Sequence, residues 1–209
     1  MKGNIKKLAV FVSIAWIFTL VTIASAHEPK GKKGLEGEYA ATSVCYSLSS
    51  SSQDFLTTLV VSPGTAFNSF ATSQTIWTFK SDGTGTVQGT QAGINPSVSA
   101  SIAELSWQIT YEITDDGTIT TNFPPGTPGV ATYTAGPMAG FKVKVDTLPQ
   151  SGMVSQDHKT ITLGTVTPVA STIKTYTPTG VLVSTIYGIS SCGRVLTRLG
   201  EFDRDAKRH

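Results

Sequence analysis

The most constraining feature of this sequence is a stretch of 14 residues, 101–114, in which apolar and polar side chains alternate almost strictly. One parity carries Ala103, Leu105, Trp107, Ile109, Tyr111 and Ile113, and the other carries Glu104, Gln108 and Glu112. A period of two over this length predicts a β-strand with one buried face. Such a strand needs a sheet that covers its apolar side.

Turn signals extend this strand into hairpins. Asp115-Asp116-Gly117 predicts a tight turn, because glycine adopts a positive φ freely and aspartate tolerates it. Residues 118–123 then form the returning strand of the hairpin, in which apolar residues again alternate. Similar patterns predict strands at 75–80, 84–88, 141–146, 160–163, 172–176, 181–190 and 192–199. With no convincing amphipathic helix after residue 26, the chain is predicted to be all-β.

Three segments are expected to be long loops, at 47–54, 89–100 and 124–140. The last holds four prolines and four glycines, which disfavour a place inside a sheet. Long loops on a rigid scaffold often line a mouth or a contact site, but they are also tolerated as insertions. The sequence leaves both interpretations open.

The N-terminus is typical of a cleavable export signal, predicted to span residues 1–26. Three lysines precede an apolar run of about 16 residues, and Ala24-Ser25-Ala26 supplies the small residues that signal peptidase requires. The run is shorter than the roughly 20 residues that span a bilayer, so we expect no membrane-spanning segment after cleavage. The localisation predicted is periplasmic or extracellular.

Cleavage changes the electrostatic character of the chain. Residues 1–26 contain three lysines and no acidic residue, so the formal charge falls from +2 to −1. Nucleic-acid partners need a basic excess, so this class is excluded. Residues 27–36 are charged and are expected to form a flexible lead-in, and residues 200–209 a polar tail.

Cys45 and Cys192 lie near the two ends of the predicted domain, 37–199. In an oxidising compartment an isolated pair most simply forms one disulfide, with two free thiols as the alternative. Closing a loop of nearly 150 residues would stabilise the fold by about 4 to 5 kcal/mol. The bridge would also bring the first strand beside the last.

These strands predict a single antiparallel up-and-down β-barrel of about 8–10 strands, since first-to-last pairing removes both open edges. A two-sheet β-sandwich is the alternative. An outer-membrane barrel is disfavoured, because its alternation would run through every strand and its end would be aromatic. This chain ends in Lys207-Arg208-His209 instead.

A few motifs carry a family resemblance. Gly37-Glu38-Tyr39 resembles the G-x-W opening of lipocalins and related calycin barrels, with tyrosine in place of tryptophan. Arg194 and Arg198 lie in the last strand, where that family places an arginine that packs across the aromatic residue at the closed end of the barrel. The chain thus resembles a bacterial lipocalin-like domain. The resemblance implies a container for small hydrophobic molecules, with Tyr39 and Arg198 packing at the barrel end.

The sequence contains no catalytic or metal constellation that fixes an activity. His27, His158 and His209 have no metal-ligand spacing, no serine lies in a nucleophile elbow, and no cofactor is implied. Most aspartates sit in turns. Glu104 and Glu112 are roughly 26 Å apart on one strand, too far to act as an acid–base pair. They would line the lumen only if the polar parity faced inward.

The aromatic residues on the apolar parity give the function hypotheses. Candidate residues of the barrel interior are Trp77, Phe79, Leu105, Trp107, Ile109, Tyr111 and Phe141. They form either the wall of a cavity for a small hydrophobic ligand or simply a filled core. The leading hypothesis is non-covalent ligand binding, with loop 124–140 at the rim. The alternatives are a cavity enzyme of the allene oxide cyclase-like or dirigent-like kind and a structural or adhesive surface domain.

Overall fold

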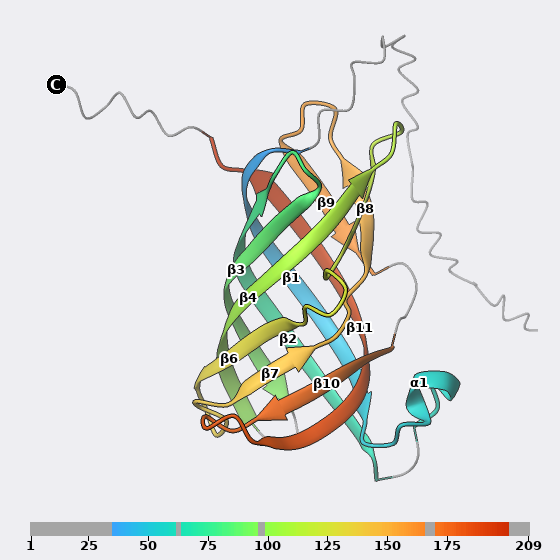
Figure 1. Cartoon of the computed structure of the whole chain (residues 1–209), viewed down its shortest axis with the longest axis vertical. Helices are drawn as coiled ribbons and strands as arrows, with labels where there is room; N and C mark the ends of the chain where they lie inside the picture. Colours follow the sequence, from blue (N-terminus) through green and yellow to red (C-terminus); the bar gives the residue numbers. More distant parts are fainter. Residues whose placement is uncertain (1–34, 62–63, 96–98, 166–169, 201–209) are drawn as a thin grey trace, which may run out of the picture. The chain divides into compact units, whose positions relative to one another are not determined.

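A computed structural model describes residues 35–61, 64–95, 99–165 and 170–200 of the chain (Figure 1). Within these residues, eleven antiparallel strands form one sheet. The strands are β1 (Gly37–Ser50), β2 (Ala66–Phe79), β3 (Thr84–Asn95), β4 (Ser99–Ile113), β5 (Thr118–Asn122), β6 (Gly129–Ala135), β7 (Lys142–Val145), β8 (Gln150–Val154), β9 (Thr160–Gly164), β10 (Ala170–Tyr176) and β11 (Leu182–Arg198). A single helical turn, α1 (Phe55–Thr58), follows β1. The predicted signal at 1–26 and most of the predicted tail lie outside the described residues.

The sheet closes on itself because β1 pairs with β2 on one side and with β11 on the other. A ring of eight strands runs β1–β2–β3–β4–β5–β8–β9–β11 and back to β1. The prediction of a closed antiparallel sheet is confirmed, and the two-sheet alternative is not found. The expected disulfide is present: Cys45 and Cys192 are direct partners in the β1–β11 register and are bonded to each other.

Two long strands each pair with two different strands along their length. Residues 102–106 of β4 pair with β6, and residues 110–113 pair with β5. In the same way, residues 182–189 of β11 pair with β10, and residues 193–197 pair with β9. The wall opposite β1–β3 therefore consists of two three-stranded patches, β5–β8–β9 and β6–β7–β10, one above the other in Figure 1.

The hydrophobic core fills the half of the ring that β5, β8 and β9 complete, and we call this part the filled half. Phe79 is 1% exposed and meets the rings of Tyr39 and Tyr111 edge-on, at centroid distances of 5.4 and 5.1 Å. The Tyr39 hydroxyl donates a hydrogen bond of 2.7 Å to the carbonyl of His158. Leu35, within the predicted lead-in, is 1% exposed and belongs to the same core. This end of the ring is sealed by side chains.

Three hairpins at this end use one kind of turn. The carboxylates of Asp82, Asp116 and Asp157 each accept a hydrogen bond of 2.9 to 3.0 Å from the backbone N–H two residues later. Together with a bond from a neighbouring hydroxyl, this lowers the pKa of each carboxyl below its ordinary value. Gly83 and Gly117 adopt φ of 82° and 83° in two of these turns, as the Asp-Gly pattern predicted.

All three segments expected to be loops contain strand residues, and the first of them, 47–54, contributes residues 47–50 to the end of β1. Residues 89–95 extend β3 against β2 and β4, and residues 129–135 form β6 between β4 and β7. Both are rich in small residues and lack a bulky alternating face, so backbone pairing with longer neighbours holds them in place. Because β6 is part of the wall, 124–140 is not a simple rim loop.

Candidate functional site

The apolar parity of β4 faces into the ring. Leu105 and Ile109 are 3% and 2% exposed, whereas Glu104, Gln108 and Glu112 on the opposite parity are exposed. The inverted arrangement, in which the two glutamates would line the lumen, is therefore not found. The lumen is lined by the residues that the alternation assigned to the buried face.

Burial of the inward side chains changes along the ring. On β2, inward Trp77 and Phe79 are buried, but inward Phe67, Ser69 and Ala71 are only half-buried. The neighbouring strands change less evenly: inward Ser47 and Ser190 are half-buried, whereas inward Ser49, Gly188 and Ser171 beyond them are buried. Inward side chains that water partly reaches are Ser47, Phe67, Ser69, Ala71, Ile173, Ile186 and Ser190. We call the part of the lumen lined by these seven residues the accessible half; β6, β7 and β10 complete its wall.

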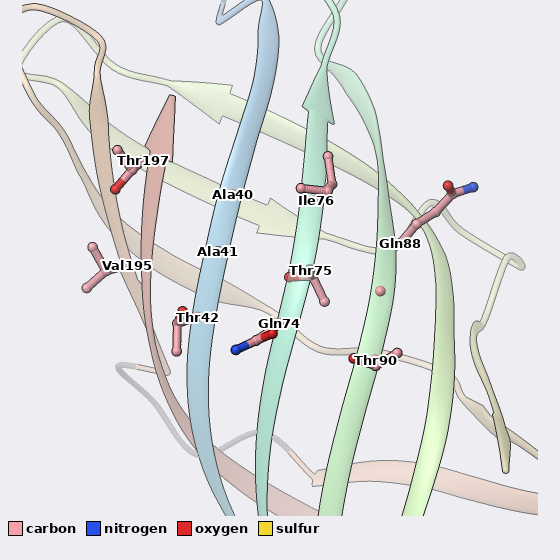
Figure 2. Close-up of a pocket in the computed structure, with 11 residues that line it drawn as sticks. Ala40, Ala41, Thr42, Gln74, Thr75, Ile76, Gln88, Thr90, Val195 and Thr197 are labelled. Carbon is pink, nitrogen blue, oxygen red and sulfur yellow. The ribbon is translucent and has the colours of Figure 1, made fainter. Parts of the chain in front are cut away.

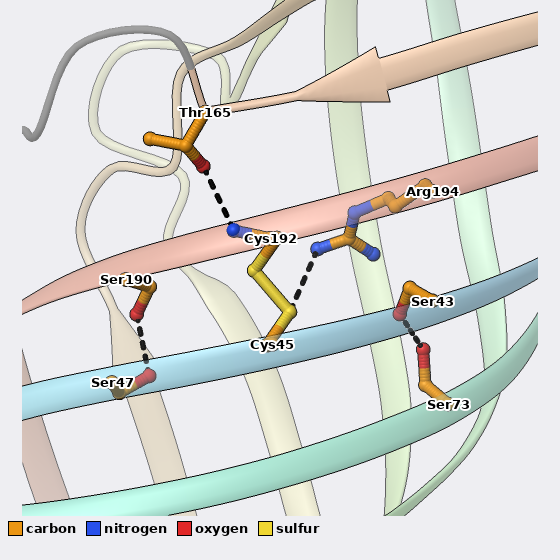
Figure 3. The surroundings of a disulfide bond; sticks show 8 residues. All are labelled: Ser43, Cys45, Ser47, Ser73, Thr165, Ser190, Cys192 and Arg194. Carbon is orange, nitrogen blue, oxygen red and sulfur yellow. Dashed lines mark hydrogen bonds between the residues drawn. A yellow bond between two sulfur atoms is a disulfide. The ribbon is translucent and has the colours of Figure 1, made fainter. Parts of the chain in front are cut away.

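Arg194 lies at the boundary between the two halves, and it is the one buried charged side chain among the residues described. Its side chain is 4% exposed, and its backbone pairs with Ser43. The guanidinium carbon lies 5.6 Å from the ring centres of both Trp77 and Trp107. Figure 3 shows the guanidinium turned back toward the disulfide, where Nη2 approaches the Cys45 sulfur at 3.9 Å.

The next inward pair along β1 and β11 is Ser47 and Ser190, whose hydroxyls share a hydrogen bond of 2.8 Å (Figure 3). These two serines are half-buried and belong to the accessible half. The buried guanidinium of Arg194 therefore lies just inward of this half-buried pair of serines. In the other direction the core of the filled half begins at Leu196, which is 0% exposed.

No counter-charge accompanies this buried cation. Every aspartate and glutamate in the described part of the chain is exposed. Two of the guanidinium nitrogens of Arg194, Nε and Nη1, have no hydrogen-bond partner. Burial lowers the pKa of Arg194 to about 10, so the group stays protonated at neutral pH. A charged, desolvated donor with unfilled hydrogen-bonding positions is unusual in a protein interior.

A second buried polar group without partners lies on β8. Gln150 is 3% exposed, and neither its Nε2 nor its Oε1 has a partner. In the strand register, Ser151 lies level with Gly164 and Gly193. Gln150, one residue earlier on β8, therefore falls on the row of Cys192. Gln150 lies on β8, one of the strands that complete the filled half, so it adds a second buried and unpaired polar side chain to the ring.

The predicted interior residues lie in different parts of the ring. Trp77 and Trp107 flank the Arg194 guanidinium, and Trp77 also belongs to the core that contains Phe79, Ile109 and Tyr111, with Trp107 packed against it. Leu105 is buried on the part of β4 that pairs with β6. Phe141 is half-buried and directly precedes β7. Tyr39 and Arg198 are direct partners in the β1–β11 register, and the exposed Arg198 donates a 3.0 Å hydrogen bond to the carbonyl of Glu36.

The sequence analysis named Arg194 only through the family resemblance, without predicting that it is buried, and it did not single out Gln150. Arg194 shares its parity with Cys192 and Leu196, and this spacing was the available signal that it faces inward. No comparable signal identifies Gln150, because it opens a short strand with a glycine at its centre.

Two hollows lie on the outer face of the sheet. The first, of about 570 Å³, crosses β11, β1, β2 and β3 and is lined by threonine, alanine, glutamine and aliphatic side chains without a titratable group (Figure 2). The second, of about 460 Å³, contains Lys144, Asp146, Lys174 and Tyr176. Lys144 Nζ lies 4.9 Å above the Tyr176 ring. Neither hollow buries an unpaired polar group.

Within the described segments, no three His, Cys, Asp or Glu side chains are grouped so that they could hold a metal ion. The same segments contain no helix with the length and apolar character needed to cross a membrane. Searches against protein-family models, curated proteins and solved structures find no match to this chain. The function must therefore be argued from the site itself.

Proposed function

We propose that this protein is an exported container that holds a small hydrophobic molecule non-covalently in the accessible half of its lumen. The observation that carries this proposal is the change in burial along the ring. One half is filled by aromatic and aliphatic side chains, and the other carries smaller inward residues, of which seven are half-buried and others, such as Ser49 and Ser171, are buried. A ring closed at one end and reached by water at the other suits a ligand that enters from one side.

The lining of the accessible half supports a ligand with apolar surface. Ile173 and Ile186 face each other across the β10–β11 pair, and Ala71 lies level with Cys45 on the neighbouring strand. Ser47, Ser69 and Ser190 add hydroxyls that can orient a polar group. The resemblance to lipocalins implies the same kind of function.

Action outside the cytoplasm is part of this proposal. The disulfide between β1 and β11 suits an oxidising compartment, and the N-terminal sequence has the pattern of an export signal.

A cavity enzyme is the second candidate, because such an enzyme needs an unpaired polar group in its lumen. Arg194 and Gln150 meet that requirement. An arginine and an amide can stabilise developing negative charge on a bound intermediate, without a nucleophile or a metal. Turnover of any candidate ligand would distinguish this activity from simple binding.

The test is binding of the neutral probe N-phenyl-1-naphthylamine to the full chain and to two tryptophan variants. Ala71→Trp places a large ring in the accessible half, and Thr72→Trp places the same ring on the outer face of the same strand. We expect saturable binding by the wild type and Thr72→Trp, and loss of binding in Ala71→Trp. Circular dichroism spectra and melting curves establish that both variants fold. Equal binding by the two variants, or no saturable binding by the wild type, would overturn the proposal.

A further inference from the structure

We infer that the ligand carries an anionic oxyacid group, a carboxylate or a phosphate, which Arg194 binds at the inner end of the accessible half. This inference rests on the proposed function, because it places a head group on the molecule that the lumen holds. It explains a buried cation for which the described part of the chain provides no anion.

The first step is electrostatic. Removing a guanidinium from water without a counter-ion is costly, and the loss is recovered only with an opposite charge or a full set of hydrogen bonds. Trp77 and Trp107 interact with the guanidinium through their ring faces, which offsets part of this cost. The two ring faces do not accept the hydrogen bonds that the N–H groups of the guanidinium donate in its own plane. Nε and Nη1 are buried and lack an acceptor, which an oxyanion reaching them would supply.

The second step concerns Gln150. Its amide supplies a donor, Nε2, and an acceptor, Oε1, both unpaired. A carboxylate or phosphate has oxygens for the donor, and a protonated phosphate oxygen or a hydroxyl on the ligand suits the acceptor. An acidic side chain at this position would repel an anion, whereas the neutral amide does not.

The third step fixes the direction of binding. The filled half blocks movement beyond Arg194, since Leu196 and Phe79 are fully buried there. The ligand therefore enters head first, and its apolar part lies toward Ala71, Ile173 and Ile186. A molecule with an anionic head and an alkyl or aromatic body matches both regions.

The test compares molecules with the same ten-carbon tail: decanoate and decyl phosphate as anions, decanol as the neutral form and decylamine as the cation. Each displaces N-phenyl-1-naphthylamine from the full-length protein at pH 7. We expect at least one of the anions to bind about 10- to 100-fold more tightly than decanol, the range for hydrogen bonds to a charged group. Decylamine should bind more weakly than decanol.

Arg194→Met should reduce binding of that anion to the level of decanol and leave decanol within about twofold of the wild type. Arg198→Met is the matched control, because Arg198 lies on the same strand but is exposed. It should change neither affinity. Gln150→Leu, a second variant at the site, should weaken the anion at least threefold without weakening decanol.

The outcomes separate the two proposals. If decanol and both anions bind the wild type equally, the inference is overturned while the container function stands. If none of the four displaces the probe, and the probe itself does not bind, both proposals fail. The wild-type comparison needs no variant, so it decides the matter even where Arg194→Met does not fold. Equal loss of anion binding in Arg198→Met would also overturn the assignment to Arg194.

Discussion

Replacing Arg194 by methionine should stabilise the ligand-free protein. Replacing a residue that holds a fold together lowers its stability, whereas replacing a residue that serves binding often raises it. Methionine has a similar length, fills irregular space and carries no charge to desolvate. The substitution therefore removes the buried charge and preserves most of the packing against the two tryptophans.

The magnitude follows from the pKa of Arg194. Burial lowers this pKa from its ordinary value to about 10, which corresponds to about 3 kcal/mol against the charged form in the folded state. The sign is unambiguous at neutral pH. A base whose pKa is lowered by folding carries its full penalty below this pKa, and the penalty is relieved only as the pH rises above about 10.

Two interactions oppose this gain. The contacts with Trp77 and Trp107 are worth about 0.5 to 1 kcal/mol each, and methionine recovers part of them through sulfur–aromatic contact. The expected net stabilisation is about 1 to 2 kcal/mol.

The assay is urea unfolding at pH 7 of delipidated protein with the disulfide intact. Arg198→Met, at the exposed end of the same strand, should change stability by less than about 0.5 kcal/mol. A loss of about 2 kcal/mol or more in Arg194→Met would refute the reasoning. That result would make the arginine a structural partner of the tryptophans.

Three further predictions concern the scaffold and can be measured by the same unfolding assay. Replacing Cys45 and Cys192 by alanine should cost about 4 to 5 kcal/mol, because the bridge closes a separation of 147 residues; a loss below about 1 kcal/mol would contradict this account. Tyr111→Phe should cost about 1 to 2 kcal/mol, since the hydroxyl lies 2.5 Å from the carbonyls of Leu35 and Lys80, and only the Lys80 carbonyl keeps another donor, the Gly83 N–H; an unchanged midpoint would show that the Leu35 carbonyl finds another partner. Gly89→Ala should cost about 2 kcal/mol or more, because its φ is 154° and an added Cβ would press on the facing backbone of β2, whereas Gly193→Ala, with open space around it, should be close to neutral; equal costs would refute the steric argument.

The sequence predicted the strands whose side chains alternate and the turns with special backbone chemistry. The long period of two fixes β4 and its inward face, and the Asp-Gly pairs identify hairpins because their φ values restrict the choice of residue. These signals depend only on residues close in sequence, so they can be recognised without knowledge of the fold.

The parts that escaped prediction depend on distant partners. Residues 129–135 carry no alternation, and β6 exists because β4 and β7 offer free backbone on both sides. The division of β4 and β11 between two sets of partners has no local signature either. For this reason the aromatic residues of the filled half and those beside Arg194 could not be separated from the sequence.

The central claim is that an anionic ligand lies in the accessible half with its head group on Arg194. A crystal structure of the full chain with decanoate or decyl phosphate, whichever binds more tightly, tests this most directly. The account predicts an oxyanion within hydrogen-bond distance of Arg194 Nε or Nη1 and a tail that runs past Ser47 and Ser190. A ligand found only in the outer hollow of Figure 2, with Arg194 still unpaired, would contradict it.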